Sequence, residues 1–458
     1  MTRVLLLSTY EMGHQPLGLA APAAALRAAG HDVECADLAI ESPSLEAVRH
    51  AELVGISMPM HTAARIAVRV AERVRQAAPD LPIVAYGLYA APLHEALARR
   101  GLVDATVGGE VEPALVELAN DVADGRPLTS TLGFARDAMP LPDRRGLPTL
   151  ERYAQMRRAD GLHLAGYVEA SRGCAHTCTH CPITPVYGGR LRLVDAEHVL
   201  ADIDAQVALG AEHITLGDPD FLNAVPHSMA ILEEMHRRQP DVTFDVTVKV
   251  EHLVEHEALL PRLHELGCLF VTSAFESLDD EVLVRLEKGH MRADIERALD
   301  AAERAGVVVR PTWMAFTPWT TLEGFAALLD FVERRGLVHH VQAVQFALRL
   351  LVPPGSALLP QLEAAGVLDE FDDEALTYRW THPDARVDAL QLRVASIVEE
   401  AASLHDHAGA LDQAAAEVHL FARIKAAALE ALGRDATGIE VVPQPRRVVP
   451  GLTESWFC

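Results

Sequence analysis

Positive charge, long hydrophobic runs and cysteine are all scarce in this sequence of 458 residues. It has 40 Lys and Arg against 65 Asp and Glu, for a formal net charge of −25. Nucleic-acid binders need clustered basic side chains to displace counterions from phosphates, so we expect no nucleic-acid partner. No apolar run reaches the roughly 18 residues of a membrane span, and the opening MTRVLLLSTYE is too short an apolar stretch for a signal peptide. We therefore expect a cytoplasmic protein with small-molecule partners and no membrane contact.

The few cysteines are unevenly distributed. There are six, which is too few for a disulfide framework in a chain of this length. Three of them, Cys174, Cys178 and Cys181, fall in the stretch RGCAHTCTHC at residues 172–181. In a reducing compartment such a cluster indicates metal or redox chemistry.

Residues 1–125 alternate short apolar runs with helical patterns. The expected strands are RVLLLS, HDVECADL, LVGISM and PIVAYG. This alternation predicts an α/β domain with a doubly wound, Rossmann-like parallel sheet. Its ligands would bind beyond the carboxyl ends of the strands, at loops 8–17, 57–61, 87–92 and 108–112. Residues 126–160 include a stretch rich in Pro, Gly and Asp without clear periodicity, which predicts a linker.

A second alternating series occupies residues 161–352. Its expected strands are HLAGYVEAS, HITLGD, TFDVTVK, LFVTSAFE, VVVRPTWMAF and VQAVQFALRLL. Six units are fewer than the eight of a closed barrel, so we predict a partial (β/α)6 barrel with its catalytic face at the carboxyl ends of the strands. Residues 353–458 read as a C-terminal helical region that ends in a Pro-rich tail.

The spacing of the clustered cysteines distinguishes between two kinds of metal site. Structural zinc takes four ligands, usually as two separated pairs, and here no second pair follows. His176 or His180 could supply a fourth ligand, so zinc stays open as an alternative. An iron–sulfur cubane takes one cysteine per iron, and three cysteines would leave one iron free to bind a substrate or cofactor.

This cysteine spacing, in a loop after the first barrel strand, resembles the radical S-adenosylmethionine (SAM) superfamily. The resemblance implies that Cys174, Cys178 and Cys181 hold a [4Fe-4S] cluster whose fourth iron chelates the methionine part of SAM. The reduced cluster would pass one electron to the sulfonium and break a carbon–sulfur bond, which implies an electron donor such as flavodoxin or ferredoxin. His180 stands where the family often has an aromatic residue, and it could pack against adenine.

Segments at later strand ends extend the resemblance. In GDPDF, Asp218 and Asp220 stand where the family contacts the SAM amino group. Two carboxylates two residues apart in an extended stretch point to the same side, so both could face cofactor or substrate; the alternative is an ordinary turn. The segment AFES, followed by VLVRLEKGH, is similar to the family segment that approaches the SAM ribose, which indicates Glu276 and Ser277.

Two cationic side chains are candidates for the carboxylate of SAM. Lys249 follows the third expected strand, in VTVKVEHL, and Arg310 lies in the fifth. Either could pair with the methionine carboxylate. Either could equally belong to a structural ion pair.

The N-terminal segments resemble cobalamin-binding domains fused to radical SAM barrels. The segments PLGL, GHDV, VGIS, YGLYA and VGGEVEPALVELA occur in the order seen there, and they indicate Gly87 and Gly109 as cofactor contacts. The Asp-x-His-x-x-Gly motif for a lower imidazole ligand is absent, and Leu88 stands where a second glycine is common. A domain of this fold used only for packing or as a lid is the alternative.

Further stretches, among them VYGGRLR, FTPWTT, LRLLVPPGS and the closing LTESWFC, resemble one radical SAM sub-family. It is named for a tail of Cys-Sec-Ala-Glu-Pro or Cys-Cys-Ala-Glu-Pro, which would begin at Cys458. We expect that the gene continues through a selenocysteine codon and that Cys458 takes part in catalysis as a soft nucleophile. The alternative is an exposed last residue.

These features lead to three functional hypotheses. The first is a radical SAM enzyme that uses cobalamin to methylate an unactivated carbon of a small molecule. The second is a cobalamin-independent enzyme that transfers an aminocarboxypropyl or other SAM-derived group to a soft acceptor, such as arsenic or selenium, held near the tail. The third is a non-catalytic zinc or iron–sulfur protein.

Overall fold

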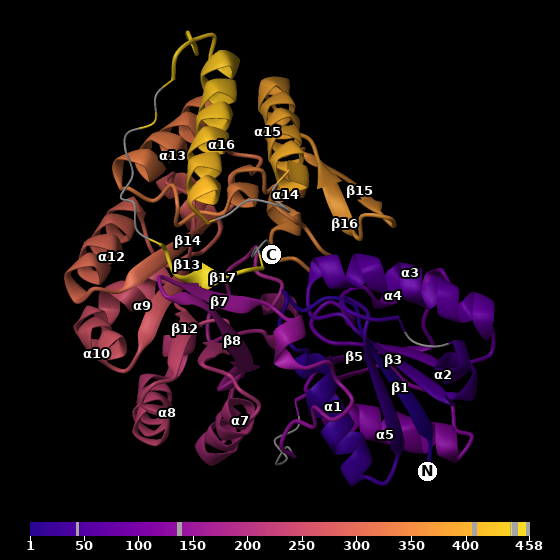
Figure 1. The fold of residues 1–458 in the computed structure, drawn as a ribbon. Helices are drawn as coiled ribbons and strands as arrows, with labels where there is room; N and C mark the ends of the chain where they lie inside the picture. Colours follow the sequence, from indigo (N-terminus) through magenta and orange to yellow (C-terminus); the bar gives the residue numbers. More distant parts are fainter. Residues whose placement is uncertain (43–44, 135–139, 405–409, 440, 442–447, 455–458) are drawn as a thin grey trace.

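The computed structural model describes residues 1–42, 45–134, 140–404, 410–439, 441 and 448–454. An N-terminal α/β domain lies beside a curled central sheet, and helices of the C-terminal region stand over both (Figure 1). This arrangement confirms the predicted fold class. Among the described residues, no helix is long and apolar enough to cross a membrane.

The N-terminal sheet has six parallel strands in the order β2-β1-β3-β4-β5-β6. The strands are β1 (Arg3–Ser8), β2 (Asp32–Asp37), β3 (Leu53–Ser57), β4 (Ile83–Tyr86), β5 (Ala105–Gly109) and β6 (Thr131–Gly133). The helices are α1 (Leu17–Ala28), α2 (Leu45–His50), α3 (His61–Ala77), α4 (His94–Arg99) and α5 (Val111–Ala123). One apolar core packs α1 and α5 on one face of the sheet, and a second packs α3 and α4 on the other. The sheet is therefore doubly wound, with its strand ends facing the loops predicted to bind ligand.

The central sheet has the order β14-β13-β12-β11-β8-β7-β17. Its five parallel strands are β8 (Gly161–Val168), β11 (His213–Leu216), β12 (Thr243–Thr247), β13 (Cys268–Glu276) and β14 (Val308–Trp313). Between and after them lie α7 (Ala196–Ala208), α8 (Val225–Arg238), α9 (Val250–Glu255), α10 (Leu260–Glu265), α11 (Asp280–Arg285), α12 (Arg292–Ala305) and α13 (Leu322–Arg334). A short ribbon of β9 (Ser171–Gly173) and β10 (Leu191–Leu193) and the helix α6 (Thr184–Tyr187) follow β8.

The prediction of a sixth barrel strand in VQAVQFALRLL is wrong. This stretch forms a 3-10 turn, Ala343–Phe346, and only an isolated bridge joins Arg349 to Phe316. The side chain of Gln345 accepts a hydrogen bond from the backbone of Trp313 at 3.1 Å. A side chain thus satisfies an edge amide of β14 that a further strand would otherwise pair.

The predicted linker at 126–160 is also only partly a linker. It contains β6, which joins the N-terminal sheet, and β7 (Gln155–Arg158), which pairs antiparallel with β8. Both strands are short, three and four residues, and therefore leave little periodic signal in the sequence.

The C-terminal region is mainly helical, with α14 (Leu359–Ala364), α15 (Ala385–Leu404) and α16 (Ala410–Ala431). It also contains an unpredicted hairpin, β15 (Leu368–Asp372) and β16 (Thr377–Trp380). The hairpin tip reaches the N-terminal domain, where Leu376 is buried in the core that includes α3 (Figure 1). His61, at the start of α3, contacts the carbonyl of Ala375 at 2.7 Å.

The tail returns to the central sheet as β17 (Gly451–Leu452), which pairs antiparallel with β7. Just before it, the carbonyl of Pro450 accepts a hydrogen bond from Arg310 of β14 at 2.9 Å. The tail therefore contacts both outer strands of the half-barrel, β7 and β14. Glu454 then accepts a hydrogen bond from Tyr10 of the N-terminal domain at 2.8 Å.

Candidate functional site

The three clustered cysteines lie in the loop between β9 and α6, at the carboxyl end of the first barrel strand. All three are free thiols, with Cys174 9 % and Cys178 7 % exposed and Cys181 half-buried. The backbone of Cys181 donates to the carbonyl of Cys178 at 3.1 Å, which turns the loop back on itself. Burial raises the pKa of Cys181 to about 11. This raised pKa does not oppose metal binding, because a bound metal deprotonates a thiol outright. Three free thiols in one loop match the protein ligands of a [4Fe-4S] cluster that has one open iron.

A buried cation stands beside these thiols. Lys288 is 4 % exposed, and its charge interacts with the thiols of Cys178 and Cys181. Its Nζ lies 3.3 Å from Oε1 of Glu276, and Nε2 of His180 lies 3.2 Å from the same oxygen. Burial alone would raise the pKa of Glu276, but Lys288 and His180 lower it to about 2. The structure thus brings the predicted residues Glu276 and His180 together beside the cysteine loop, and adds Lys288.

Lys288 was not predicted, although it lies in the segment VLVRLEKGH that follows Glu276. The resemblance of this segment to the family was the available signal. Ser277 is not part of this group among the described contacts; its Oγ accepts a hydrogen bond from the backbone of Asp279, which begins the turn into α11.

Asp218 lies buried just after β11. Its carboxylate accepts hydrogen bonds from the backbone of Ala170, at 3.0 Å, and from the hydroxyl of Ser171. Burial raises its pKa to about 7 despite these bonds. The side chain therefore holds the segment that leads from β8 to the cysteine loop.

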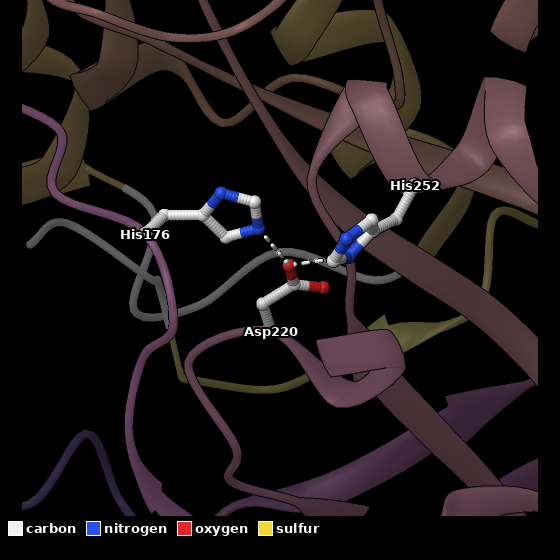
Figure 2. Close-up of side chains that lie close together, drawn as sticks. All are labelled: His176, Asp220 and His252. Atoms are coloured by element: carbon white, nitrogen blue, oxygen red, sulfur yellow. Dashed lines mark ion pairs between the residues drawn. The ribbon is translucent and has the colours of Figure 1, made fainter. Parts of the chain in front are cut away.

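Asp220 faces two imidazoles, as Figure 2 shows. Its Oδ2 lies 2.7 Å from Nδ1 of His252 and 3.6 Å from Nε2 of His176. Burial would raise the pKa of Asp220, but the two histidines lower it to about 2. The three side chains come from the carboxyl ends of consecutive sheet neighbours: the loop after β8, the turn after β11 and helix α9 after β12. His252 was missed from the sequence, where its place in VTVKVEHL after a strand was the only signal.

Lys249 and Arg310, the candidates for the SAM carboxylate, have protein partners. Nζ of Lys249 lies 3.0 Å from Glu251, and the backbone of Lys249 donates to Asp220 at 3.4 Å. Arg310 packs over the ring of Phe270 and donates to Pro450 in the tail. Lys249 is therefore close to the Asp220 group, whereas Arg310 is joined to the tail and, among the described contacts, not to the cysteine loop.

Buried ion pairs join the N-terminal domain to the cysteine loop. Arg172, two residues before Cys174, lies 2.8 Å from Glu112 and 3.2 Å from Glu110. Burial opposes the charge of Arg172, but Glu112 and Glu169 raise its pKa above the usual range. Glu112 is in the first turn of α5, so the carboxyl end of β5 faces the cysteine loop.

The two glycines predicted to contact cobalamin occupy positions that demand glycine. Gly109 has φ +74°, and a Cβ there would lie 2.1 Å from the carbonyl oxygen of Gly133. Gly87 has φ +105°, and a Cβ would lie 3.1 Å from the backbone of Met58. Leu88 packs partly against the N-terminal core rather than standing free in the loop. The loop after β1 also faces the barrel, where His14 lies against the ring of Tyr167 with centroids 4.6 Å apart.

The orientation of the N-terminal sheet fits a ligand held between the two domains. Its carboxyl-end loops after β1 and β5 contact the barrel close to the cysteine loop. This is the edge where open α/β sheets bind ligands. Cys458, predicted to be catalytic, lies outside the described residues.

Two family models match the chain. The radical SAM superfamily model matches residues 168–332, and the B12 binding domain model matches residues 3–119. The first spans the cysteine loop and strands β11 to β14, and the second spans strands β1 to β5 of the doubly wound sheet.

Named relatives match the chain in part. A hopanoid C-3 methylase from Methylococcus capsulatus is 23% identical over 67% of this chain and 62% of its own length. A bacteriochlorophyllide d C-8(2)-methyltransferase from Chlorobaculum tepidum is 23% identical over 59% of this chain and 60% of its own. The chain thus spans about three fifths of the length of these relatives.

Solved structures share the fold. The cobalamin-dependent SAM radical enzyme OxsB, with aqua-cobalamin bound, has a TM-score of 0.70 and 14% identity, over 94% of this chain and 72% of its own. The radical SAM methyltransferase TsrM from Kitasatospora setae has a TM-score of 0.56 and 19% identity, over 73% and 70%. The two matched family models thus assign residues 168–332, which carry the cysteine loop, to the radical SAM superfamily and residues 3–119 to the B12 binding domain.

Proposed function

We propose that this enzyme transfers a methyl group to an unactivated carbon of a small molecule, using SAM, a [4Fe-4S] cluster and cobalamin. The observation that carries the proposal is the meeting of the cysteine loop with the carboxyl-end loops of the B12-type sheet, through Arg172 and Glu112. Two of the named relatives are methyl-transferring enzymes, which supports the choice of reaction. When bound, the cluster supplies the electron that cleaves SAM, and cobalamin supplies the methyl group.

In this proposal the residues in and around the cysteine loop have separate roles. Cys174, Cys178 and Cys181 bind the cluster, and Lys288 offsets the negative charge that their thiolates bring into a buried site. Glu276, held as an anion by Lys288 and His180, accepts hydrogen bonds from hydroxyl groups of the SAM ribose. Asp218 keeps the loop in place through Ala170 and Ser171.

The interface between the domains sets the distance between the two cofactors. The pair formed by Arg172 and Glu112 is buried, so it is screened little by solvent and resists separation. Gly109, three residues before Glu112, allows the close approach of β5 to β6 that places α5.

We also propose a flavodoxin or ferredoxin as electron donor and a cytoplasmic location, since cluster thiols need a reducing compartment. The stretches FTPWTT and LRLLVPPGS support membership of the sub-family with the Cys-Sec-Ala-Glu-Pro or Cys-Cys-Ala-Glu-Pro tail. Reading the codons that follow Cys458 tests this: Ala-Glu-Pro after a UGA or Cys codon is expected, and its absence would contradict it.

Product analysis tests the proposed reaction. The reconstituted enzyme is incubated anaerobically with hydroxocobalamin, a reductant and SAM carrying a deuterated methyl group. Deuterated methylcobalamin and 5′-deoxyadenosine are expected from the native chain and from Cys268→Ala, and not from Cys178→Ala. Cys268 is a matched control because it is a free, buried cysteine at the start of β13, outside the cysteine loop. Transfer of an aminocarboxypropyl group instead would contradict the proposal.

A further inference from the structure

Two histidines and one carboxylate converge beside the cysteine loop without a role in the function proposed above. The donor atoms are Nε2 of His176, Oδ2 of Asp220 and Nδ1 of His252, and all lie within 4.8 Å of one another. Figure 2 shows both imidazoles turned toward the same carboxylate oxygen. Two imidazoles and one carboxylate are a common ligand set for Zn²⁺ and Fe²⁺ in proteins.

These three donor atoms are buried and lack a well-formed hydrogen bond. Nε2 of His176, Oδ2 of Asp220 and Nδ1 of His252 all belong to the buried polar atoms that have no hydrogen-bond partner of good geometry. Leaving such a group unsatisfied costs about 1–3 kcal/mol. These three atoms face one another as ion pairs without a well-aligned hydrogen bond, which is how the ligands of one metal ion are arranged.

The spacing of the donors also suits a metal ion. Four ligands at about 2.0–2.1 Å around a tetrahedral ion lie roughly 3.3 Å from one another. Oδ2 of Asp220 lies 2.7 Å from the His252 donor and 3.6 Å from the His176 donor, so small side-chain movements suffice.

Outer contacts orient two of the ligands. Nδ1 of His176 lies 3.8 Å from Oε2 of Glu251, so a small side-chain movement would bring this carboxylate into a hydrogen bond behind the imidazole. The second oxygen of Asp220 accepts a hydrogen bond from the backbone of Lys249. A carboxylate behind a ligating histidine fixes the tautomer that binds metal and raises its basicity.

We propose that His176, Asp220 and His252 bind a divalent transition-metal ion of the Zn²⁺ or Fe²⁺ type, separate from the iron–sulfur cluster. Three protein ligands leave one coordination position open. His176 is two residues after Cys174, so the open position lies beside the cysteine loop on the catalytic face. There it would take an oxygen or nitrogen atom of the substrate. This inference goes beyond the proposed methyl transfer and does not depend on it.

Metal counting with Co²⁺ as the probe tests the site. The full chain is reconstituted with iron and sulfide under anaerobic conditions, treated with a mild chelator and titrated with Co²⁺. We expect about one cobalt per chain beyond the cluster iron, with a visible spectrum of nitrogen and oxygen ligation and no intense thiolate-to-cobalt band. His256→Ala is the matched control, because its ring lies next to His252, with centroids 5.7 Å apart, but supplies no donor.

Asp220→Asn and His252→Ala should abolish the cobalt binding, His256→Ala should keep it, and Glu251→Gln should weaken it by about 10- to 100-fold. Iron content and circular dichroism show whether each variant is folded and loaded. Absence of the extra cobalt in the native chain, or equal binding by Asp220→Asn and His256→Ala, would overturn the proposal and leave an ion pair in its place. Low iron with cobalt retained would contradict the proposed function and still support this site.

Discussion

Nη2 of Arg172 lies 2.8 Å from Oε1 of Glu112, and this buried pair joins the barrel to the N-terminal domain two residues before Cys174. Both side chains are largely withdrawn from solvent, at 14% and 3% exposed. The position of the B12-binding domain and the position of the cysteine loop are therefore fixed by the same contact.

We predict that Glu112→Gln lowers stability by about 1–2 kcal/mol, because Arg172 loses one charged hydrogen-bond partner while Glu110 and Glu169 remain beside it. Urea unfolding at pH 7 measures the loss. Glu117→Gln is the control, since Glu117 is an exposed carboxylate on the same helix, α5. Equal effects of the two substitutions would show that the pair contributes nothing specific.

We predict that Lys288→Met prevents stable loading of the cluster, whereas Lys288→Arg retains much of it. The Lys288 charge interacts with two of the thiols and pairs with Glu276, so its loss leaves several negative charges unopposed in a buried site. Iron and sulfide counts after reconstitution measure the difference. Full iron content in Lys288→Met would contradict this assignment.

We predict that Asp218 makes the stability of the fold depend on pH. Burial raises its pKa from an ordinary value of 3.8 to about 7, so the folded chain holds a proton that the unfolded chain releases. Its contribution to stability is therefore present below about pH 4 and falls as pH rises to 7, by at most about 1.4 kcal/mol per pH unit.

Asp218→Asn should flatten the pH dependence of stability in that range, while Asp241→Asn, at an exposed site before β12, should leave it unchanged. Thermal unfolding followed from pH 5 to pH 7 provides the measurement. A pH dependence of the Asp218→Asn variant that matches the native chain would argue against a neutral, buried Asp218.

The tail contact between Tyr10 and Glu454 can be tested by a double-mutant cycle. Their hydrogen bond of 2.8 Å should give a coupling energy of about 1 kcal/mol between Tyr10→Phe and Glu454→Ala. Chemical unfolding of the two single variants and the double variant supplies the four free energies. Strict additivity would mean that the tail does not hold the N-terminal domain in solution.

Five of the six predicted barrel strands are present, because buried parallel strands form short apolar runs that are easy to read. The sixth failed because the side chain of Gln345, rather than a backbone ladder, satisfies β14. The hairpin of β15 and β16 was missed because its first strand, LDEFD, is acidic and partly exposed. The local sequence pattern does not show that a distant side chain will pair with an edge strand, or that an acidic stretch will form a hairpin.

The site residues were predictable where a short stretch of sequence carries the signal by itself. The cysteine spacing alone indicated Cys174, Cys178 and Cys181, and a family segment indicated Glu276. The partners His252 and Arg172 were missed because their roles depend on which strand ends become neighbours and on how two domains meet. β11 lies next to β12 in the sheet, and only that adjacency brings His252 to Asp220.

We propose that one chain holds both a cluster at its cysteine loop and cobalamin in its N-terminal domain. The most direct test is to reconstitute the chain anaerobically, pass it through a desalting column and count iron and cobalamin in the same fraction. We predict about four irons and one cobalamin per native chain, with iron lost and cobalamin kept in Cys181→Ala. Zinc in place of iron at the cysteines, or a fraction free of cobalamin, would show that the chain does not hold both cofactors.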